Sequence, residues 1–127
     1  MATEQRHFRQ QDIVWPVKQR EMHNHHMDST RWNTFKFRDD DVIVATYAKS
    51  GTTWMQQIVA QLVFGGGENH AVAKLSPWVD LRIIPQQVID DLEMQTHRRV
   101  MKTHLPVDAL VYSPKAKYIF VLSLIHI

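Results

Sequence analysis

The sequence predicts an α/β fold with a mostly parallel sheet flanked by helices. Apolar, β-branched runs recur along the chain at residues 42–47 (VIVATY) and 118–124 (YIFVLSL), with a shorter candidate at residues 99–103. Between them lie segments with helical spacing, at residues 53–64 and 85–93. Strands that alternate with helices along the chain are typical of parallel sheets. No internal repeat interrupts this order, so a single domain is predicted.

The N-terminal part of the chain differs in composition from the remainder. Residues 1–31 are polar and rich in His, Arg and Gln, so we expect an irregular arm with one short helix near residues 16–26. Residues 32–41 (WNTFKFRDDD) alternate aromatic and polar side chains before three aspartates, which favours a short strand or a loop that ends in a turn. The uninterrupted apolar run at residues 42–47 is typical of a strand that is covered on both faces.

A helix is predicted over residues 53–64. Trp54, Ile58 and Leu62 recur at i, i+4 spacing and therefore share one face of this helix. The three glycines at residues 65–67 end it, because glycine is the usual residue at a helix C-terminus.

The second half of the chain contains shorter elements. Residues 76–78 (SPW) indicate a helix entry or an ordered loop, and residues 85–93 a short helix that begins with proline. Strands are predicted at residues 99–103 and 118–124. One helical turn is expected between them, at residues 107–110.

Composition excludes several classes of protein. The chain has 127 residues, 44% of them hydrophobic and 22% charged, as in ordinary globular proteins. A net charge of +2, spread along the chain, does not indicate a nucleic-acid or membrane partner. There is no cysteine, which excludes a disulfide framework. Neither a signal-peptide core nor an apolar run of membrane-spanning length is present, so we expect a cytoplasmic protein.

No metal site is predicted. The segment HNHH, residues 23–26, contains histidines of the type that bind metal, but no matching cluster of ligands occurs elsewhere. The aspartates at residues 39–41 are most simply a turn before a strand.

The polar loop in TYAKSGTTW, residues 46–54, lies between a predicted strand and a predicted helix. The first N–H groups of a helix lack partners and, with the helix dipole, attract anions. Lys49 adds a full positive charge, Gly51 lets the backbone approach a ligand, and Trp54 offers a flat face on which a base can stack. The hydroxyl donors of the loop are Ser50, Thr52 and Thr53.

The composition of this loop also suits an ordinary helix start. Ser or Thr before a helix is a routine N-cap, and glycine in a turn is equally routine. The order of strand, Lys-Ser-Gly-Thr-Thr and a helix that opens with tryptophan favours phosphate binding instead. The loop is not a Walker A motif, because Lys49 precedes the glycine. A kinase or hydrolase with a degenerate P-loop is the alternative enzyme, although no Mg²⁺-binding acid after a strand is visible.

A second polar segment, KTHLP at residues 102–106, follows the strand candidate RRVM. Ligands of doubly wound sheets bind beyond the carboxyl ends of strands. If the two strands are neighbours, Lys49, Lys102 and His104 converge on one edge of the sheet. A histidine there can take a proton near neutral pH, and two lysines can stabilise developing negative charge.

These segments resemble the cytosolic-type sulfotransferases. TYAKSGTTWMQQI is similar to that family's 5′-phosphosulfate-binding loop, TYPKSGTTW, and KTHLP to its catalytic segment. SPWVDLR, residues 76–82, resembles an SPWIE-like stretch, and KYIFV, residues 117–121, resembles the strand KYIYV. Four segments in the same order cover residues 32–121. The resemblance implies a P-loop-like α/β fold and transfer of a sulfuryl group from 3′-phosphoadenosine-5′-phosphosulfate (PAPS) to a small-molecule hydroxyl or amine acceptor.

The resemblance also implies roles for individual residues. His104 would be the general base, Lys49 would contact the phosphosulfate, and Lys102 would hold the sulfuryl group in line. Trp54 would stack on adenine and Trp78 would lie near the acceptor pocket. The 5′-phosphate would be bound by Ser50, Gly51, Thr52 and Thr53. No metal is required, because lysines neutralise the charge.

The chain departs from the family pattern in two places. Ala48 replaces the usual proline, a change that we expect to be tolerated. After KYIFV the family continues into an Arg-Asn-Pro-Lys-Asp-like segment that contacts the 3′-phosphate, whereas this chain reads LSLIHI. We therefore expect residues 32–121 to be the N-terminal part of a sulfotransferase domain, truncated, and residues 122–127 a non-native or truncated tail. A non-catalytic fragment, inactive as it stands, is the corresponding alternative.

Overall fold

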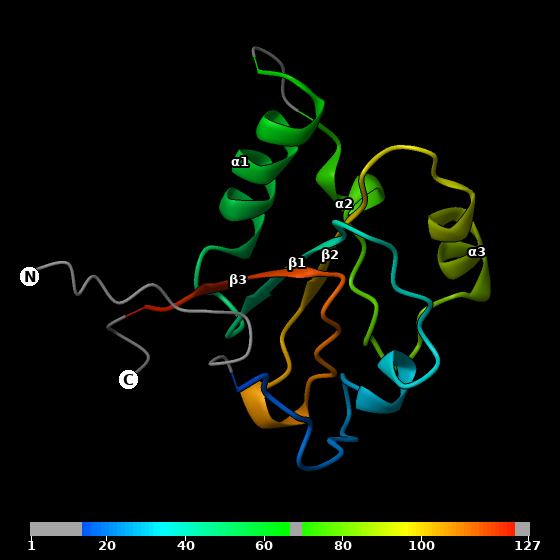
Figure 1. The fold of residues 1–127 in the computed structure, drawn as a ribbon, viewed down its shortest axis with the longest axis vertical. Helices are drawn as coiled ribbons and strands as arrows, with labels where there is room; N and C mark the ends of the chain where they lie inside the picture. Colours follow the sequence, from blue (N-terminus) through cyan, green and yellow to red (C-terminus); the bar gives the residue numbers. More distant parts are fainter. Residues whose placement is uncertain (1–13, 67–69, 124–127) are drawn as a thin grey trace, which may run out of the picture.

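The computed structural model of the chain describes residues 14–66 and 70–123. Its strands β1 (Val42–Thr46), β2 (Val100–Thr103) and β3 (Lys117–Val121) form one parallel sheet in the order β2-β1-β3 (Figure 1). β1 is therefore the central strand, hydrogen-bonded on both sides. This is the predicted α/β class, with a parallel sheet flanked by helices.

The α-helices lie between β1 and β2. α1 (Thr52–Phe64) follows β1, and α2 (Val72–Leu75) and α3 (Gln86–Met94) lie between α1 and β2 (Figure 1). Two short 3₁₀ turns complete the described elements, η2 (Ser29–Trp32) before β1 and η3 (Val107–Ala109) between β2 and β3.

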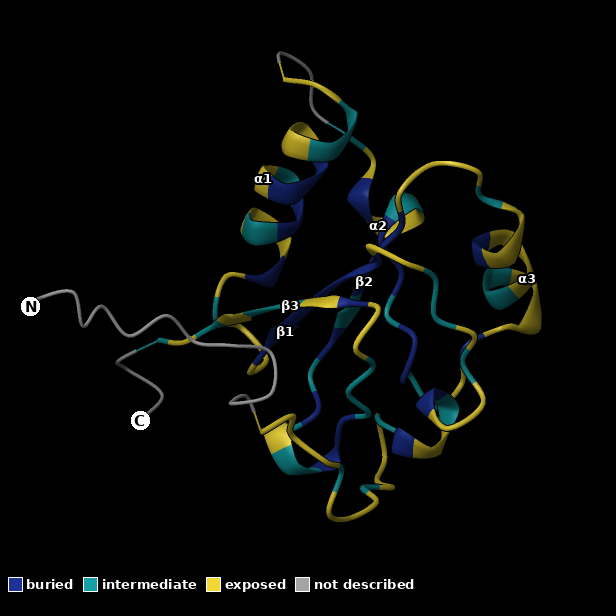
Figure 2. Cartoon of the chain, viewed as in Figure 1, coloured by how far each residue is buried: buried dark blue, intermediate teal, exposed yellow. Residues whose placement is uncertain are grey.

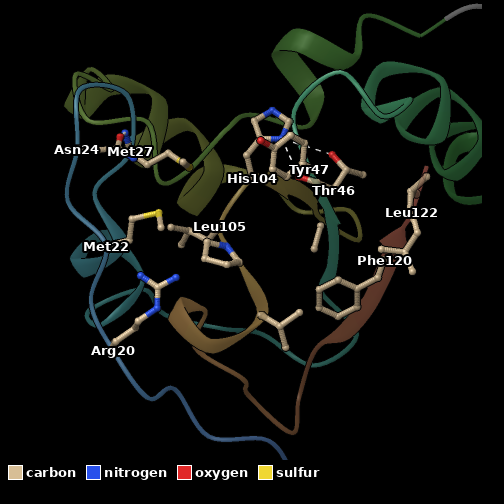
Figure 3. A pocket seen from close by; sticks show the side chains of 14 residues that line it. Arg20, Met22, Asn24, Met27, Thr46, Tyr47, His104, Leu105, Phe120 and Leu122 are labelled. Carbon is tan, nitrogen blue, oxygen red and sulfur yellow. Dashed lines mark hydrogen bonds between the residues drawn. The ribbon is translucent and has the colours of Figure 1, made fainter. Parts of the chain in front are cut away.

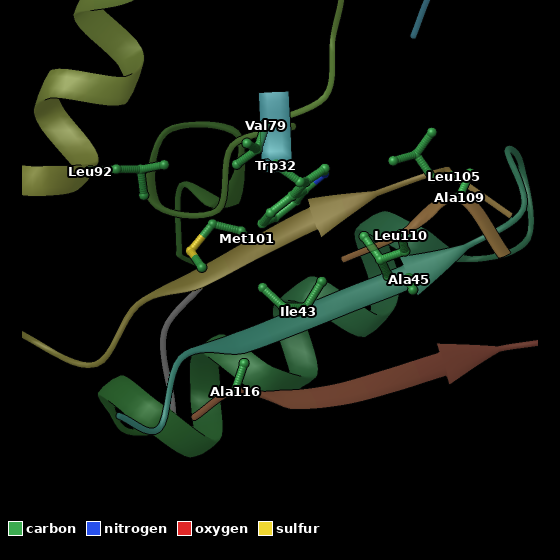
Figure 4. Close-up of a cluster of buried hydrophobic side chains, with 10 residues drawn as sticks. All are labelled: Trp32, Ile43, Ala45, Val79, Leu92, Met101, Leu105, Ala109, Leu110 and Ala116. Atoms are coloured by element: carbon green, nitrogen blue, oxygen red, sulfur yellow. The ribbon is translucent and has the colours of Figure 1, made fainter. Parts of the chain in front are cut away.

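The core consists of two clusters, one on each face of the sheet. Val42 and Val44 of β1 pack toward α1, where they meet Val59. Ile43 and Ala45 point to the opposite face and belong to a larger cluster, drawn in Figure 4. That cluster also contains Trp32, Val79, Leu92, Met101, Leu105, Ala109, Leu110 and Ala116. Because successive side chains of a strand point to opposite faces, a strand buried on both faces is apolar throughout.

A buried ion pair joins the N-terminal ends of β1 and β2. Arg99 Nε lies 3.0 Å from Asp41 Oδ1, and Arg99 Nη2 lies 2.5 Å from Asp41 Oδ2. Both side chains are almost fully buried, at 1% and 2% exposure. The carboxylate also accepts the backbone N–H of Arg38, and Arg99 donates to the carbonyl of Lys36, so the pair is well satisfied.

The predicted strands and longer helices are confirmed, with boundaries that differ by one to a few residues. The helical turn after β2 is confirmed as η3, and residues 76–78 form an ordered loop. α2 had no sequence prediction. Leu124 of the predicted third strand lies outside the described residues.

The short helix predicted near residues 16–26 is wrong. The N–H groups of Gln19 and Arg20 donate to the carbonyl oxygen of Asp108, at 2.8 and 3.2 Å, rather than to carbonyls one helical turn away. His23 and Met27 form isolated bridges with Asp28 and Leu81. Contacts with distant parts of the chain therefore replace local helical ones. The domain boundaries at residues 31 and 122 stay predictions.

The apolar face of α1 does not point into the core. Trp54, Ile58 and Leu62 are 76%, 39% and 81% exposed, and Figure 2 shows exposed residues along the outer side of this helix. Val59 and Gln56 face inward instead, and Gln56 Nε2 donates to Ser76 through both the carbonyl and the hydroxyl oxygen.

Candidate active site

The two polar segments predicted to converge leave the sheet at the same edge. β1 and β2 are adjacent and parallel, with Ala45 opposite Thr103. The loop of residues 47–51 follows β1, and His104 follows β2 directly. Their positions agree with the rule that ligands of parallel sheets bind beyond the carboxyl ends of the strands.

The loop after β1 has an unusual backbone. Lys49 and Gly51 have positive φ angles, 63° and 96°, while Ser50 between them does not. When successive residues of a loop alternate between left-handed and right-handed backbone conformations, their N–H groups point to one side and form an anion-binding concavity. A left-handed lysine costs about 1–2 kcal/mol, and such strain is concentrated at functional sites. A Cβ placed on Gly51 would meet nothing within 4 Å, so the space beside the loop is open.

Some side chains at the start of α1 pack against the sheet, and others are exposed to solvent. Lys49, Thr53 and Trp54 are exposed, so they are available to a ligand. Thr52 is buried, and its hydroxyl forms a hydrogen bond with the Thr46 hydroxyl at the end of β1. The Thr52 side chain therefore fixes the helix to the strand, and its contribution to an anion site would come from its backbone N–H.

His104 is held in a defined tautomer by β1. Its Nδ1 lies 3.0 Å from the carbonyl oxygen of Thr46 and 3.3 Å from the Thr46 hydroxyl. A carbonyl oxygen only accepts, so Nδ1 carries the proton and donates it. In the neutral ring the lone pair is then on Nε2, the nitrogen able to act as a base.

Trp78, in the segment before α3, contacts both Lys102 of β2 and His104, which follows β2. The ring of Trp78 meets the ring of His104 edge to face, with centroids 4.7 Å apart. Lys102 Nζ lies 5.7 Å from the centroid of the same indole. The backbone N–H of Lys102 donates to the carbonyl of Pro77 at 3.0 Å, which fixes the two segments side by side.

Lys102 is half-buried, and burial lowers the pKa of its amine below the usual value, an effect that the negative charge of Asp80 partly opposes. No carboxylate lies within ion-pair distance of Lys49, Lys102 or His104 in the described part of the chain. The charges of Lys49 and Lys102 are therefore not neutralised by a direct ion pair and are available to an anionic ligand.

The predicted residues do not all line one cavity. His104, Thr46 and Tyr47 line an open cavity of about 490 Å³, whose other lining residues include Met22 and Phe120 (Figure 3). Trp78 and Lys102 border a separate cavity of about 290 Å³. His104 lines the first cavity and Trp78 the second, and the two rings are in contact.

Two residues of this site were not found from the sequence. Thr46 fixes His104 mainly through a backbone carbonyl, which no sequence pattern reveals. Asp80 is fully buried and accepts the indole N–H groups of Trp32 and Trp78. Its position two residues after Trp78, inside SPWVDLR, was the available signal.

Among residues 14–66 and 70–123, no three His, Cys, Asp or Glu side chains gather closely enough to hold a metal ion. Over the same residues, none of the helices has the length and apolar character needed to cross a membrane.

Comparison with known proteins places this geometry in a family. A model described as "Sulfotransferase domain" matches residues 39–123, which contain the loop after β1, the 76–80 segment and His104. The chain belongs to the sulfotransferase family. The match covers the whole sheet together with α1, α2 and α3.

Individual sulfotransferases resemble the chain closely. A glycolipid sulfotransferase of Mycobacterium tuberculosis is 42% identical over 96 residues, 74% of this chain and 29% of the relative. Mouse sulfotransferase 2B1 is 33% identical over 122 residues, 91% of this chain and 34% of the relative. A rabbit amine sulfotransferase is 36% identical over 94 residues, 68% of this chain and 30% of the relative. The chain thus spans about a third or less of the length of these relatives.

Proposed function

We propose that this chain supplies the donor-binding loop and the catalytic base of an enzyme that transfers a sulfuryl group from PAPS to a hydroxyl or amine acceptor. The observation that carries the proposal is the orientation of His104. Its Nδ1–H is held by the Thr46 carbonyl, so its Nε2 lone pair is available at the sheet edge where the loop of residues 47–51 begins.

The loop has the features that a nucleotide phosphosulfate requires. Lys49 and Trp54 are exposed beside it, and the positive φ angles of Lys49 and Gly51 turn backbone donors outward. Lys49 would contact the phosphosulfate, Trp54 would stack on adenine, and Lys102 would hold the sulfuryl group. Ligands to the 5′-phosphate would come from Ser50, Gly51, Thr52 and Thr53. Lysine charge would replace the metal that many phosphoryl transfers use.

His104 would take the proton from the acceptor. As the sulfuryl group of PAPS leaves the 5′-phosphate and bonds to the acceptor oxygen or nitrogen, the acceptor proton passes to His104 Nε2. The Thr46 carbonyl then stabilises the imidazolium that forms, because it already accepts the Nδ1–H.

The acceptor would lie in the cavity that His104 lines. The 490 Å³ cavity contains this histidine together with apolar side chains such as Met27 and Leu105. Relatives are named for glycolipid and amine substrates, so acceptors with an apolar body and one hydroxyl or amine are the class to test. The Trp78 ring, which contacts the His104 ring, would form one side of the acceptor site.

Binding of the 127-residue chain to adenosine 3′,5′-bisphosphate, measured by calorimetry, tests the donor loop. Lys49→Ala should weaken binding roughly tenfold to hundredfold, because a hydrogen bond to a charged group contributes about 1.5–3 kcal/mol. Lys115→Ala, at an exposed turn before β3, is the matched control and should leave the affinity unchanged. Equal affinities for all three proteins, or preferential binding of ATP with Mg²⁺, would contradict the proposal.

A further inference from the structure

We propose that Asp80 is a positioning residue of the transfer site, whose buried carboxylate holds the indole of Trp78 against His104 and Lys102. This assignment rests on the proposed function, because it concerns the same base. It adds a residue that contacts neither the donor loop nor the cavity at His104, and that acts through another side chain.

The Asp80 carboxylate is surrounded by donors. Trp32 Nε1 donates to Oδ2 at 2.7 Å, and Trp78 Nε1 donates to Oδ1. The Thr103 hydroxyl, which accepts the N–H of Leu105 at 3.0 Å, lowers the pKa of the same carboxyl and so opposes the effect of its burial. Asp80 is fully buried, so each of these contacts is shielded from water.

The contacts connect Asp80 to the functional residues through one ring. The N–H edge of the Trp78 indole is bound by Asp80, while its ring is packed edge to face with the His104 ring and lies under the Lys102 amine. An indole pinned at its nitrogen cannot rotate about χ2 without breaking that hydrogen bond. The orientation of Trp78, and with it the packing of His104, therefore depends on the carboxylate.

The chemistry of the cluster requires a carboxylate rather than an amide. Two indole N–H groups approach different oxygens of Asp80, and an asparagine would present only one oxygen and turn an NH₂ group toward the other indole. Within the described residues no cation lies within ion-pair distance of Asp80. Burial raises the pKa of this carboxyl, while the hydroxyl and indole donors oppose that rise. The hydrogen bonds of the Asp80 carboxylate therefore orient the two indole rings, and the carboxylate forms no ion pair with the described residues.

Nuclear magnetic resonance of the ¹⁵N-labelled 127-residue chain, without any ligand, tests the proposal. The indole N–H of Trp78 should exchange with solvent at least about tenfold more slowly than that of exposed Trp54, as expected for a hydrogen bond to a buried charged acceptor. Exchange of the two indoles at similar rates would overturn the proposal. The result is independent of donor binding, so it can fail while the proposed function stands.

Substitutions of Asp80 and Trp78 test whether the carboxylate positions the indole or only fills space in the core. Asp80→Asn and Trp78→Phe should each shift the ring resonances of His104, and the double variant should shift them no further than either single change, because both act through one hydrogen bond. Asp90→Asn, which removes an exposed α3 carboxylate, is the control and should leave these resonances unchanged.

Unaltered His104 resonances in folded Asp80→Asn, or additive shifts in the double variant, would overturn the assignment. If Asp80→Asn fails to fold, the proposal is tested by the indole exchange of the wild-type chain and by the shift of the His104 resonances in Trp78→Phe.

Discussion

The two ends of the three-stranded sheet differ in whether their positively charged side chains are paired with a carboxylate. At the N-terminal end, Arg99 and Asp41 are buried together in a two-point ion pair. At the C-terminal end, Lys49 and Lys102 have no carboxylate within ion-pair distance among the described residues. One end is neutral and closed, and the other is cationic and open.

In the proposed function, the N-terminal end of the sheet contributes stability and the C-terminal end binds the donor. Removing one partner of a buried ion pair leaves an uncompensated charge, so the Arg99 end tolerates little change. A cation without a partner is instead able to bind an incoming anion. Asp80, whose carboxylate accepts the indole N–H groups of Trp32 and Trp78, acts on Lys102 electrostatically but forms no ion pair with it.

The largest effect is expected at His104. In a catalytically active form of the protein, His104→Ala should lower the rate of sulfuryl transfer by roughly 10²–10⁴-fold, the usual contribution of a general base, without changing donor affinity. Steady-state kinetics and calorimetry measure the two quantities. His97→Ala, at an exposed histidine before β2, is the control. A His104→Ala enzyme with the wild-type rate would remove this residue from the chemistry.

At the opposite end of the sheet, Arg99→Met should act on stability alone. Leaving Asp41 buried and unpaired is expected to lower the free energy of unfolding by roughly 3–5 kcal/mol. Urea denaturation measures the loss. The exposed neighbour provides the control, Arg98→Met, and adding Asp41→Leu to Arg99→Met should recover much of the stability. A loss below about 1 kcal/mol would mean that the pair does not anchor the strands.

Gly51→Ala tests the backbone of the open end. A Cβ at Gly51 meets no atom within 4 Å, so the cost comes from the left-handed φ of 96° and should be about 1–2 kcal/mol. We expect either lower stability or, if the loop relaxes, weaker binding of adenosine 3′,5′-bisphosphate. Gly66→Ala is a close control, since its surroundings are equally open and its φ is not in this region. Equal behaviour of the two variants would argue against a strained loop.

The smallest effect concerns pH. Burial lowers the pKa of Lys102, so this lysine loses its proton at a pH below the usual value for an amine. Anion binding favours the protonated form, and the affinity for adenosine 3′,5′-bisphosphate should therefore fall as pH rises through this lowered pKa. In Lys102→Arg the decline should disappear, because arginine stays charged. A decline of the same size in both proteins would assign it to another group.

Much of this architecture could be predicted from local sequence. The uninterrupted apolar run of β1 indicated a strand buried on both faces, and polar segments after β1 and β2 indicated the functional edge. The strand prediction is confirmed, because burial on both faces leaves a pattern within a few residues, while the function of that edge stays a prediction.

Features that depend on distant partners could not be predicted. Asp80 is bound by Trp32, 48 positions earlier in the chain, and Arg99 pairs with Asp41 across 58 positions. The apolar stripe of α1 indicated a helix but not which of its faces meets the sheet. In the same way, contacts with η3 replaced the helix that local composition favoured near residues 16–26.

The most direct test of the contrast between the two ends is to map where an anion binds. Amide resonances of the ¹⁵N-labelled 127-residue chain would be followed during titration with adenosine 3′,5′-bisphosphate. We predict saturable shifts at residues 47–54 and 102–104, beyond the carboxyl ends of β1 and β2, with residues 38–41 and 98–100 unchanged. Shifts centred on the Arg99–Asp41 end, or spread over both ends alike, would contradict the account.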